Sequence, residues 1–314
     1  MTEAHDQLHD RMPAATPAAQ PDADSLTRFL LQEAGVRGVR VHLDATWQQI
    51  RARAEYPLAI SELLGEAAAA SALFTAHAKI EGRLSIQLRG EGPLRTLFAE
   101  CTAAGTLRGI AQVDEGVALP RDLRLLGSNA VLAITIENPG AAGREPTRYQ
   151  GMVALESDSL AEALEGYFRQ SEQLPTRLLL AVDEHRAAGL MLQKLPGDGG
   201  DEDGWARALA LVETLSQQEL LEWPTETLLL KLFHQDDARV LDVRPLRFAC
   251  SCSRDRVVSM LHALGKDEAE AAAADGVAEI RCEFCGQQYL FDADEIAGIF
   301  QHFAAAQPTP ERLQ

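Results

Sequence analysis

The sequence predicts an α+β protein built from three successive parts: an N-terminal α+β domain, a helical linker and a small C-terminal domain. Segments with alternating apolar residues are mixed with a few helical segments and lack a regular strand–helix–strand order, which is typical of the α+β class. A break rich in Gly and Asp follows Pro196. Four of the five cysteines then fall in two close pairs near the end of the 314-residue chain, which is long enough for more than one domain.

Composition narrows the classes of function that the chain can serve. It carries 29 Lys and Arg against 47 Asp and Glu, a net charge of −18. Nucleic-acid binding requires clustered Lys and Arg, and no basic stripe is present, so we expect no nucleic-acid partner. No apolar run of about 18 residues occurs, which argues against a membrane span. Residues 1–24 lack the basic start and apolar core of a signal peptide, so we expect a disordered tail and a cytoplasmic protein.

The N-terminal domain is expected to span residues 25–196. Ser25 is suited to cap a helix over residues 26–34. Apolar and basic residues alternate over 39–43, which predicts a half-buried strand. The Ala-rich segment 56–79 carries a stripe of Leu and predicts a central packed helix.

The rest of this domain is predicted to consist mainly of strands. Two alternating segments, 84–88 and 94–101, flank a Gly- and Pro-containing turn and predict a hairpin. Cys101 lies in the second of them and is expected to be a small core residue. Further strands are expected at 107–112, 130–137, 149–155, 177–182 and 189–193, with a helix at 159–173.

Residues 197–245 are expected to form an acidic loop and a helical linker. The loop is rich in Gly and Asp and cannot bury much surface. Apolar residues then recur at helical spacing over 205–216, and a second short helix from Pro224 carries a run of Leu. These helices need a partner for a broad apolar face. Docking onto the first domain as ordinary structure satisfies that need, and a sharper hypothesis is that this docking is reversible.

The C-terminal domain, residues 246–314, carries the motif that points to chemistry. A C-x-C and a C-x-x-C together supply four thiols, from Cys250, Cys252, Cys282 and Cys285. Four converging thiolates make a tetrahedral Zn²⁺ site with Zn–S bonds of about 2.3 Å. Ordinary structural cysteines, or disulfides of a secreted protein, are the alternative, but secreted frameworks belong to short, cysteine-dense chains with export signals.

Local geometry favours the metal hypothesis. Residues i and i+2 of an extended segment face the same side, and Gly286 permits a tight turn after the C-x-x-C. His262 and His302 are rival ligand candidates, but each lies on a predicted helix among apolar neighbours, so we interpret them as packing or surface residues.

The remainder of this domain predicts a thin core. Ser253 is suited to cap a helix, and Asp292 with Glu295 resembles a capping box before the last one. An aromatic strand lies at 289–291. Folding of so small a unit should depend on the metal, because structural zinc supplies about 10–16 kcal/mol in comparable peptides.

The sequence offers no catalytic constellation. Nucleotide-binding, zinc-protease and serine-hydrolase motifs are absent, and a closed four-cysteine site leaves no position for substrate, so we expect no enzyme. One rival is a thiol–disulfide oxidoreductase using Cys282 and Cys285, which requires the C-x-x-C at a helix start after a strand. A second rival is a constitutive interaction module in which zinc is purely structural.

Several strings in the sequence carry a resemblance to one family. They are residues 82–88 with 90–94, Arg108-Gly109, 149–151, the Y-F-R-Q-S-E-Q string at 167–173, Gly189 with 192–193 and 195–196, 248–253 and 282–286. On these residues the chain resembles the 33 kDa heat shock protein family, the redox-regulated holdase chaperones of bacteria. The resemblance extends from about residue 25 to 303 and leaves the tail before Ser25 unaccounted for.

The resemblance implies a chaperone that is inactive while reduced and zinc-bound. In such proteins peroxide or hypochlorous acid converts the four ligands to two disulfides, releases zinc and unfolds the linker, which exposes apolar surface that holds unfolding client proteins without ATP. Carried over to this sequence, the disulfides would be Cys250–Cys252 and Cys282–Cys285. A homodimer of the oxidised form is also implied. The residues agree with this scheme, because thiolate is the species that oxidants attack.

Overall fold

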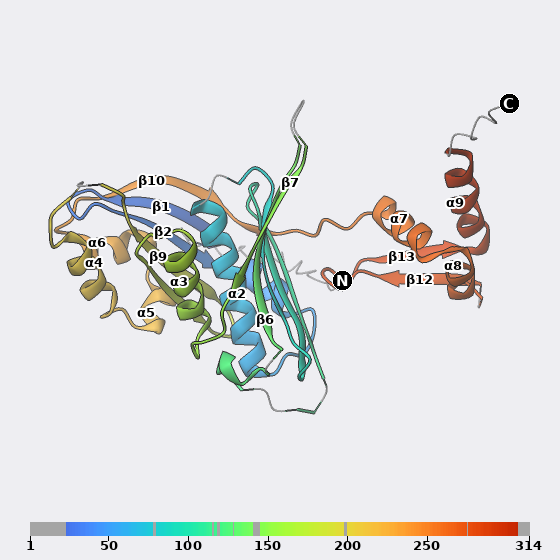
Figure 1. Cartoon of the computed structure of the whole chain (residues 1–314), viewed down its shortest axis with the longest axis horizontal. Helices are drawn as coiled ribbons and strands as arrows, with labels where there is room; N and C mark the ends of the chain where they lie inside the picture. Colours follow the sequence, from blue (N-terminus) through green and yellow to red (C-terminus); the bar gives the residue numbers. More distant parts are fainter. Residues whose placement is uncertain are drawn as a thin grey trace, which may run out of the picture.

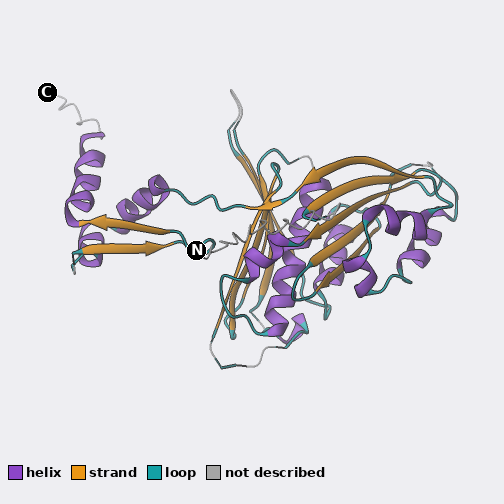
Figure 2. Ribbon diagram, turned by 180° about the vertical axis from the view of Figure 1, so that it is seen from behind, coloured by secondary structure: helices purple, strands orange, loops and turns teal. Residues whose placement is uncertain are grey.

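The computed structural model describes residues 23–306, except 78–79, 115, 118–119, 128, 141–144, 198–199 and 275, and excludes the side chains of 302–306. Two sheets and their helices form a large body, and a smaller body around a third sheet stands at one end of the long axis (Figure 1). Figure 2 gives the same arrangement from behind. The mixture of helices and sheets confirms the predicted α+β class. Residues 1–22 of the predicted tail and the side chain of His302 lie outside the described residues.

The first sheet is antiparallel, with the order β10-β1-β2-β9-β8. Its strands are β1 (Ser25–Leu31), β2 (Val36–Leu43), β8 (Thr176–Val182), β9 (Ala187–Lys194) and β10 (Ala238–Pro245). Strand β10 was not predicted. It pairs with β1, so the chain returns from the linker helices to the edge of this sheet before it enters the cysteine region.

The helix predicted over residues 26–34 is wrong, because this segment is β1 and the turn after it. Leu26, Phe29 and Leu30 have helical spacing, but β1 is paired along both edges and mostly buried on both faces. The sequence of such a strand is a nearly continuous apolar run, and periodicity alone cannot distinguish it from a helix. Gly35, with φ of 62°, serves the β1–β2 turn and not a helix end.

The second sheet has the order β11-β5-β4-β3-β6-β7 and is antiparallel except for β11, which runs parallel to β5. Its strands are β3 (Arg83–Arg89), β4 (Leu94–Thr102), β5 (Thr106–Val113), β6 (Val131–Asn138), β7 (Thr147–Val153) and β11 (Arg247–Phe248). The predicted hairpin is confirmed as β3–β4. Cys101 is 1% exposed, which confirms it as a core residue.

Helix α2 (Leu58–His77) packs between the two sheets and forms the centre of the main core. Two further helices flank it, α1 (Ala45–Arg51) and α3 (Leu160–Ser171), and a short 3₁₀ turn, η1, covers Leu123–Leu125. By length and mean hydropathy α2 alone among the described helices could cross a membrane, but 78% of its apolar window is buried inside the protein. Its apolarity is that of a core helix.

The other face of the first sheet is covered by the helical layer, α4 (Gly204–Val212), α5 (Gln217–Glu222) and α6 (Thr225–Phe233). The two predicted linker helices are confirmed as α4 and α6. The half-buried character predicted for residues 39–43 is wrong, because the helical layer covers the face that carries Arg40 and His42, which are 1% and 5% exposed.

We call residues 249–306 the C-terminal module. It contains α7 (Arg254–Leu264), α8 (Lys266–Ala272), β12 (Val277–Arg281), β13 (Gln288–Asp292) and α9 (Ala293–Ala306). The Ser253 hydroxyl accepts a hydrogen bond from the Arg256 amide, which confirms the predicted cap. The side chains of Asp292 and Glu295 each accept from the other residue's amide, which confirms the capping box.

Candidate metal centre

Four cysteine side chains converge where the C-terminal module meets the second sheet. Cys250 and Cys252 lie in the extended segment between β11 and α7, and Cys282 and Cys285 lie in the turn between β12 and β13. The four sulfurs all lie within 4.8 Å of one another. The short approaches join the two motifs: 3.6 Å between the sulfurs of Cys250 and Cys282, and 3.3 Å between those of Cys252 and Cys285.

The turn between β12 and β13 is held by its own backbone. The Gly286 amide donates to the Cys282 carbonyl at 2.8 Å, and the Cys282 amide donates to the Gln287 carbonyl at 2.9 Å. Gly286 has φ of 71°, a conformation that L side chains rarely adopt. The sequence therefore forms a knuckle that aims two sulfurs to one side.

This donor set fits a tetrahedral metal. A tetrahedron with metal–sulfur bonds of about 2.3 Å has edges of about 3.8 Å, close to the observed sulfur separations. All four cysteines are free thiols of intermediate burial, so neither disulfides nor a deep core occupies their sulfurs. The cluster can hold a metal ion.

The four thiols are not equivalent in the absence of a metal. Burial acts to raise the pKa of Cys252, but hydrogen bonds from Tyr289 and Cys285 lower it to about 7. The Tyr289 hydroxyl donates to the Cys252 sulfur at 3.2 Å. Burial raises the pKa of Cys285 to about 12. The Cys252 thiolate is thus available near neutral pH, whereas a metal must displace the proton of Cys285.

The rival ligand His262 and the fifth cysteine lie elsewhere. His262 stacks on the ring of Phe300, with ring centroids 5.6 Å apart, as expected of a packing residue. Cys101 is in β4, where burial raises the pKa of its thiol to about 12. A buried neutral thiol of this kind is inert.

The knuckle rests on the second sheet through contacts that the sequence did not predict. The ring of Phe284 lies edge-on to that of Phe98, at 5.5 Å, and under the guanidinium of Arg108, at 4.4 Å. Arg53 donates to the Cys285 carbonyl at 2.8 Å. Such long-range partners leave no local pattern in the sequence, and the one available signal was an aromatic residue, Phe284, between two candidate ligands.

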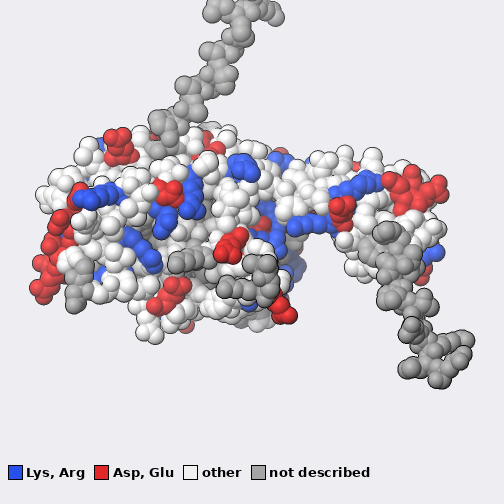
Figure 3. All heavy atoms as spheres, turned by 90° about the horizontal axis from the view of Figure 1, so that it is seen from above, with Lys and Arg blue, Asp and Glu red and all other residues white. Residues whose placement is uncertain are grey.

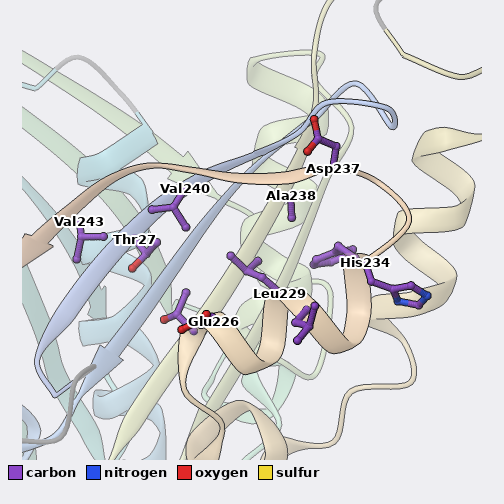
Figure 4. Close-up of a pocket in the computed structure, with 11 residues that line it drawn as sticks. Thr27, Glu226, Leu229, His234, Asp237, Ala238, Val240 and Val243 are labelled. Atoms are coloured by element: carbon purple, nitrogen blue, oxygen red, sulfur yellow. The ribbon is translucent and has the colours of Figure 1, made fainter.

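A hollow of about 460 Å³ lies away from the cysteine cluster, between β10 and α6. Figure 4 shows Thr27, Leu229 and Val240 around it, with the His234 ring turned away. Val240 and Val243 of β10 are 51% and 59% exposed. Strand β10 therefore buries little apolar surface and is held mainly by its backbone pairing with β1.

Fold and site together define an α+β protein with a four-cysteine candidate metal centre on a C-terminal module. The family model described as Hsp33 protein matches residues 24–292. The 33 kDa chaperonin of Nitrosococcus oceani is 42% identical over 290 residues, covering 92% of this chain and 98% of the relative. That of Ectopseudomonas mendocina is 43% identical over 297 residues, covering 92% and 99%. The chain belongs to the Hsp33 family, as the resemblance predicted, and the names of these relatives support a chaperone.

A solved structure has the same fold. The 33 kDa chaperonin (Heat shock protein 33 homolog) of Thermotoga maritima matches with a TM-score of 0.73, covering 90% of this chain and 99% of that one. At 21% identity this likeness establishes the fold alone.

Proposed function

We propose that the protein is a redox-regulated molecular chaperone, a holdase that works without ATP. When reduced and zinc-bound it does not bind clients, and when oxidised it binds unfolding proteins and prevents their aggregation under oxidative stress. The observation that carries this proposal is the convergence of four sulfurs within 4.8 Å, at the end of a segment that runs from the helical layer through β10 and β11. Oxidation of these sulfurs would therefore change how the C-terminal end of that segment is attached.

The proposed ligands of one Zn²⁺ are Cys250, Cys252, Cys282 and Cys285. Sulfur donors in a tetrahedral arrangement favour zinc over the hard cations Mg²⁺ and Ca²⁺. When bound, zinc keeps the sulfurs deprotonated and adds folding free energy to a unit with a thin core. The thiolates that bind the metal are also the form that oxidants attack.

The proposed reaction consumes two equivalents of peroxide. Each pair of thiolates gives up two electrons and forms one S–S bond. The O–O bond of one hydrogen peroxide molecule breaks, and its oxygens accept these electrons and two protons from solvent to give two waters. The pairs are Cys250 with Cys252 and Cys282 with Cys285, as the family resemblance implies. Two disulfides leave no thiolate donor, so the site can no longer hold its ion.

Loss of the attachment at the cysteines is proposed to release the linker. Because β10 buries little apolar surface, its detachment from β1 costs mainly backbone hydrogen bonds. The helical layer would follow, since α6 leads directly into β10. That would uncover the apolar face of the first sheet, including Phe29, Leu190 and Leu192. Large exposed apolar patches bind unfolded chains.

This proposal divides the chain into an N-terminal domain at 25–196, a redox-sensitive linker at 197–245 and a zinc-binding domain at 246–314. It includes a homodimer of the oxidised form, a cytoplasmic location and the absence of an enzymatic reaction. Nucleic acid and membranes are not among the proposed partners.

The test measures zinc content, free thiols and suppression of citrate synthase aggregation, before and after peroxide treatment with mild heat. We expect zinc release and loss of four thiols together with a gain in suppression. Equal suppression in both states would contradict the switch. Loss of activity on oxidation would favour the constitutive interaction module.

An oxidoreductase remains the enzyme alternative. The C-x-x-C lies in a turn between two strands, β12 and β13, and not at the start of a helix. That position lacks the helix N-terminus that lowers a catalytic thiol's pKa in thioredoxin-like enzymes. Catalytic turnover in an insulin-reduction assay would nevertheless support this alternative over the holdase.

A further inference from the structure

We propose that Arg108 couples the charge of the cysteine cluster to the docking of the C-terminal module on the second sheet. It is a positioning residue, not a metal ligand. This role rests on the proposed function, because it takes the metal-bound cluster as the resting state. If it is correct, oxidation undocks the module by removing charge as well as by removing the metal.

Arg108 is held in place by a partner on its own sheet. Its Nε donates to Glu100 Oε1 at 2.9 Å, and its Nη2 donates to Oε2 at 3.3 Å. The side chains of Glu100 and Arg108 are 6% and 14% exposed. A two-pronged bond to a buried carboxylate fixes the plane of the guanidinium, which a Lys ammonium could not reproduce.

The guanidinium of Arg108 also contacts the C-terminal module. The ring of Phe284 lies 4.4 Å from it and that of Phe98 lies 5.8 Å away on the sheet. Phe284 stands between Cys282 and Cys285 in the knuckle, and Cys250 is a further hydrogen-bond partner of the Arg108 side chain. Arg108 therefore bridges a buried carboxylate of the sheet and a sulfur of the cluster, as outer-sphere partners of metal ligands do.

The charge of the cluster depends on its oxidation state. Four thiolates with one divalent cation carry two negative charges, whereas two disulfides carry none. Oxidation thus removes the anion that faces Arg108. The attraction that it removes acts across a partly buried contact, where screening by water is weak.

A second contact at this junction does not depend on the charge of the cysteine cluster. Arg53 donates to the backbone carbonyl of Cys285 at 2.8 Å and lies over the ring of Phe248 at 5.0 Å. A carbonyl keeps its dipole when the sulfur is oxidised. Figure 3 shows basic side chains near the junction of the two bodies, with acidic groups gathered at both ends of the molecule. We therefore assign the redox-sensitive part of docking to Arg108.

The first experiment compares Arg108→Gln, Arg108→Lys and the control Arg95→Gln in the full-length reduced protein loaded with zinc. Arg95 lies on the adjacent strand and pairs with Asp114. Docking is read by hydrogen exchange at Arg247 and Ala249, whose amides donate to the Gly105 and Leu107 carbonyls. We expect Arg108→Gln to exchange at least about tenfold faster there and to bind zinc about tenfold more weakly in chelator competition. Arg108→Lys should be intermediate, and Arg95→Gln unchanged.

The second experiment changes the cluster's charge without oxidation. Cys285→His gives a Cys₃His set, which also binds zinc tetrahedrally but leaves one negative charge in place of two. With one zinc per chain confirmed, exchange at Ala249 should be faster than in the unsubstituted protein and less sensitive to added salt. Unchanged exchange in zinc-loaded Cys285→His, or in Arg108→Gln, would overturn the proposal.

These outcomes are separable from those of the proposed function. A reduced protein without zinc, or one whose aggregation suppression does not rise on oxidation, contradicts the holdase switch itself. A protein that binds zinc and is activated by peroxide, but whose Arg108→Gln variant docks and binds zinc like the unsubstituted chain, contradicts the role of Arg108 alone.

Discussion

The two bodies of this molecule are stabilised in different ways. The N-terminal domain places the 20-residue helix α2 between two sheets, and its core draws on nearly every strand. The core of the C-terminal module contains eight buried apolar residues among those described, three of them Ala. A core of that size is below what usually supports an independent fold without a metal or disulfide.

The difference explains how one chemical event can act on part of a protein. In the proposed mechanism, oxidation of the four sulfurs withdraws the free energy of metal binding from the module, while the N-terminal domain keeps its apolar burial. Between the two lie β10 and the helical layer, whose attachment is intermediate. Each prediction below tests whether a given change acts on one body and spares the other.

The largest effect is expected from Cys282→Ser, which removes one proposed ligand. Structural zinc contributes about 10–16 kcal/mol, so the module should unfold, and its amides over 254–299 should lose protection. The N-terminal domain should retain its protection over α2. The measurement is hydrogen exchange on the reduced protein, together with zinc content.

The matched control is Cys101→Ala, which alters the remaining cysteine, buried in β4. It should leave zinc content at one per chain and the module folded. A zinc-free Cys282→Ser protein whose module stayed protected would show that the thin core suffices without the metal. Full zinc content in this variant would show that Cys282 is not a required ligand.

A smaller effect is expected from Arg40→Ala at the boundary between the first sheet and the helical layer. Arg40 Nη1 donates to the Thr225 hydroxyl at 2.8 Å, and Nη2 donates to the Leu220 carbonyl at 3.3 Å and to the Trp223 carbonyl. Withdrawing this buried donor should cost about 3 kcal/mol. Exchange of amides in α5 and α6 should rise about a hundredfold.

Arg37→Ala is the control for that variant, because Arg37 lies on the same strand and contacts His77 of α2. It should not accelerate exchange in the helical layer. Equal acceleration by both variants would mean that the layer opens only when the whole domain unfolds.

These comparisons also indicate what the sequence could predict. The stripe of α2, the β3–β4 hairpin and the spacing of the cysteines are local signals, and each predicted its structure. Strand β1 was mistaken for a helix because two-sided burial erased its alternation. The strand that carries Arg40 was predicted to be half-buried because the helical layer that covers it lies far along the chain. Arg108 was absent from the predicted site because the cysteine region that it contacts also lies far along the chain.

Acid is expected to act on the N-terminal domain through His77. Burial, and then the neighbouring charge of Arg37, lower the pKa of His77 from 6.5 to about 4. Its neutral form is favoured by folding, so this stabilisation is complete above pH 6.5 and is lost as pH falls towards 4, with a maximum of about 3 kcal/mol. His77→Gln should show a flatter loss of stability between pH 6.5 and 4 in urea unfolding. Parallel pH profiles for the two proteins would contradict this assignment.

The smallest and sharpest comparison uses two equivalent helix caps. The Ser216 hydroxyl accepts from the Glu219 amide at 3.2 Å in the helical layer, and the Ser253 hydroxyl accepts from the Arg256 amide at 3.3 Å in the module. Replacing either by Ala should cost about 1 kcal/mol, about a fivefold change in a local equilibrium. Ser216→Ala should raise exchange in α5 fivefold and leave zinc affinity unchanged. Ser253→Ala should weaken zinc binding fivefold and leave α5 unchanged. If each variant affected both readouts equally, the helical layer and the module would form one cooperative unit, and the division between them would not hold.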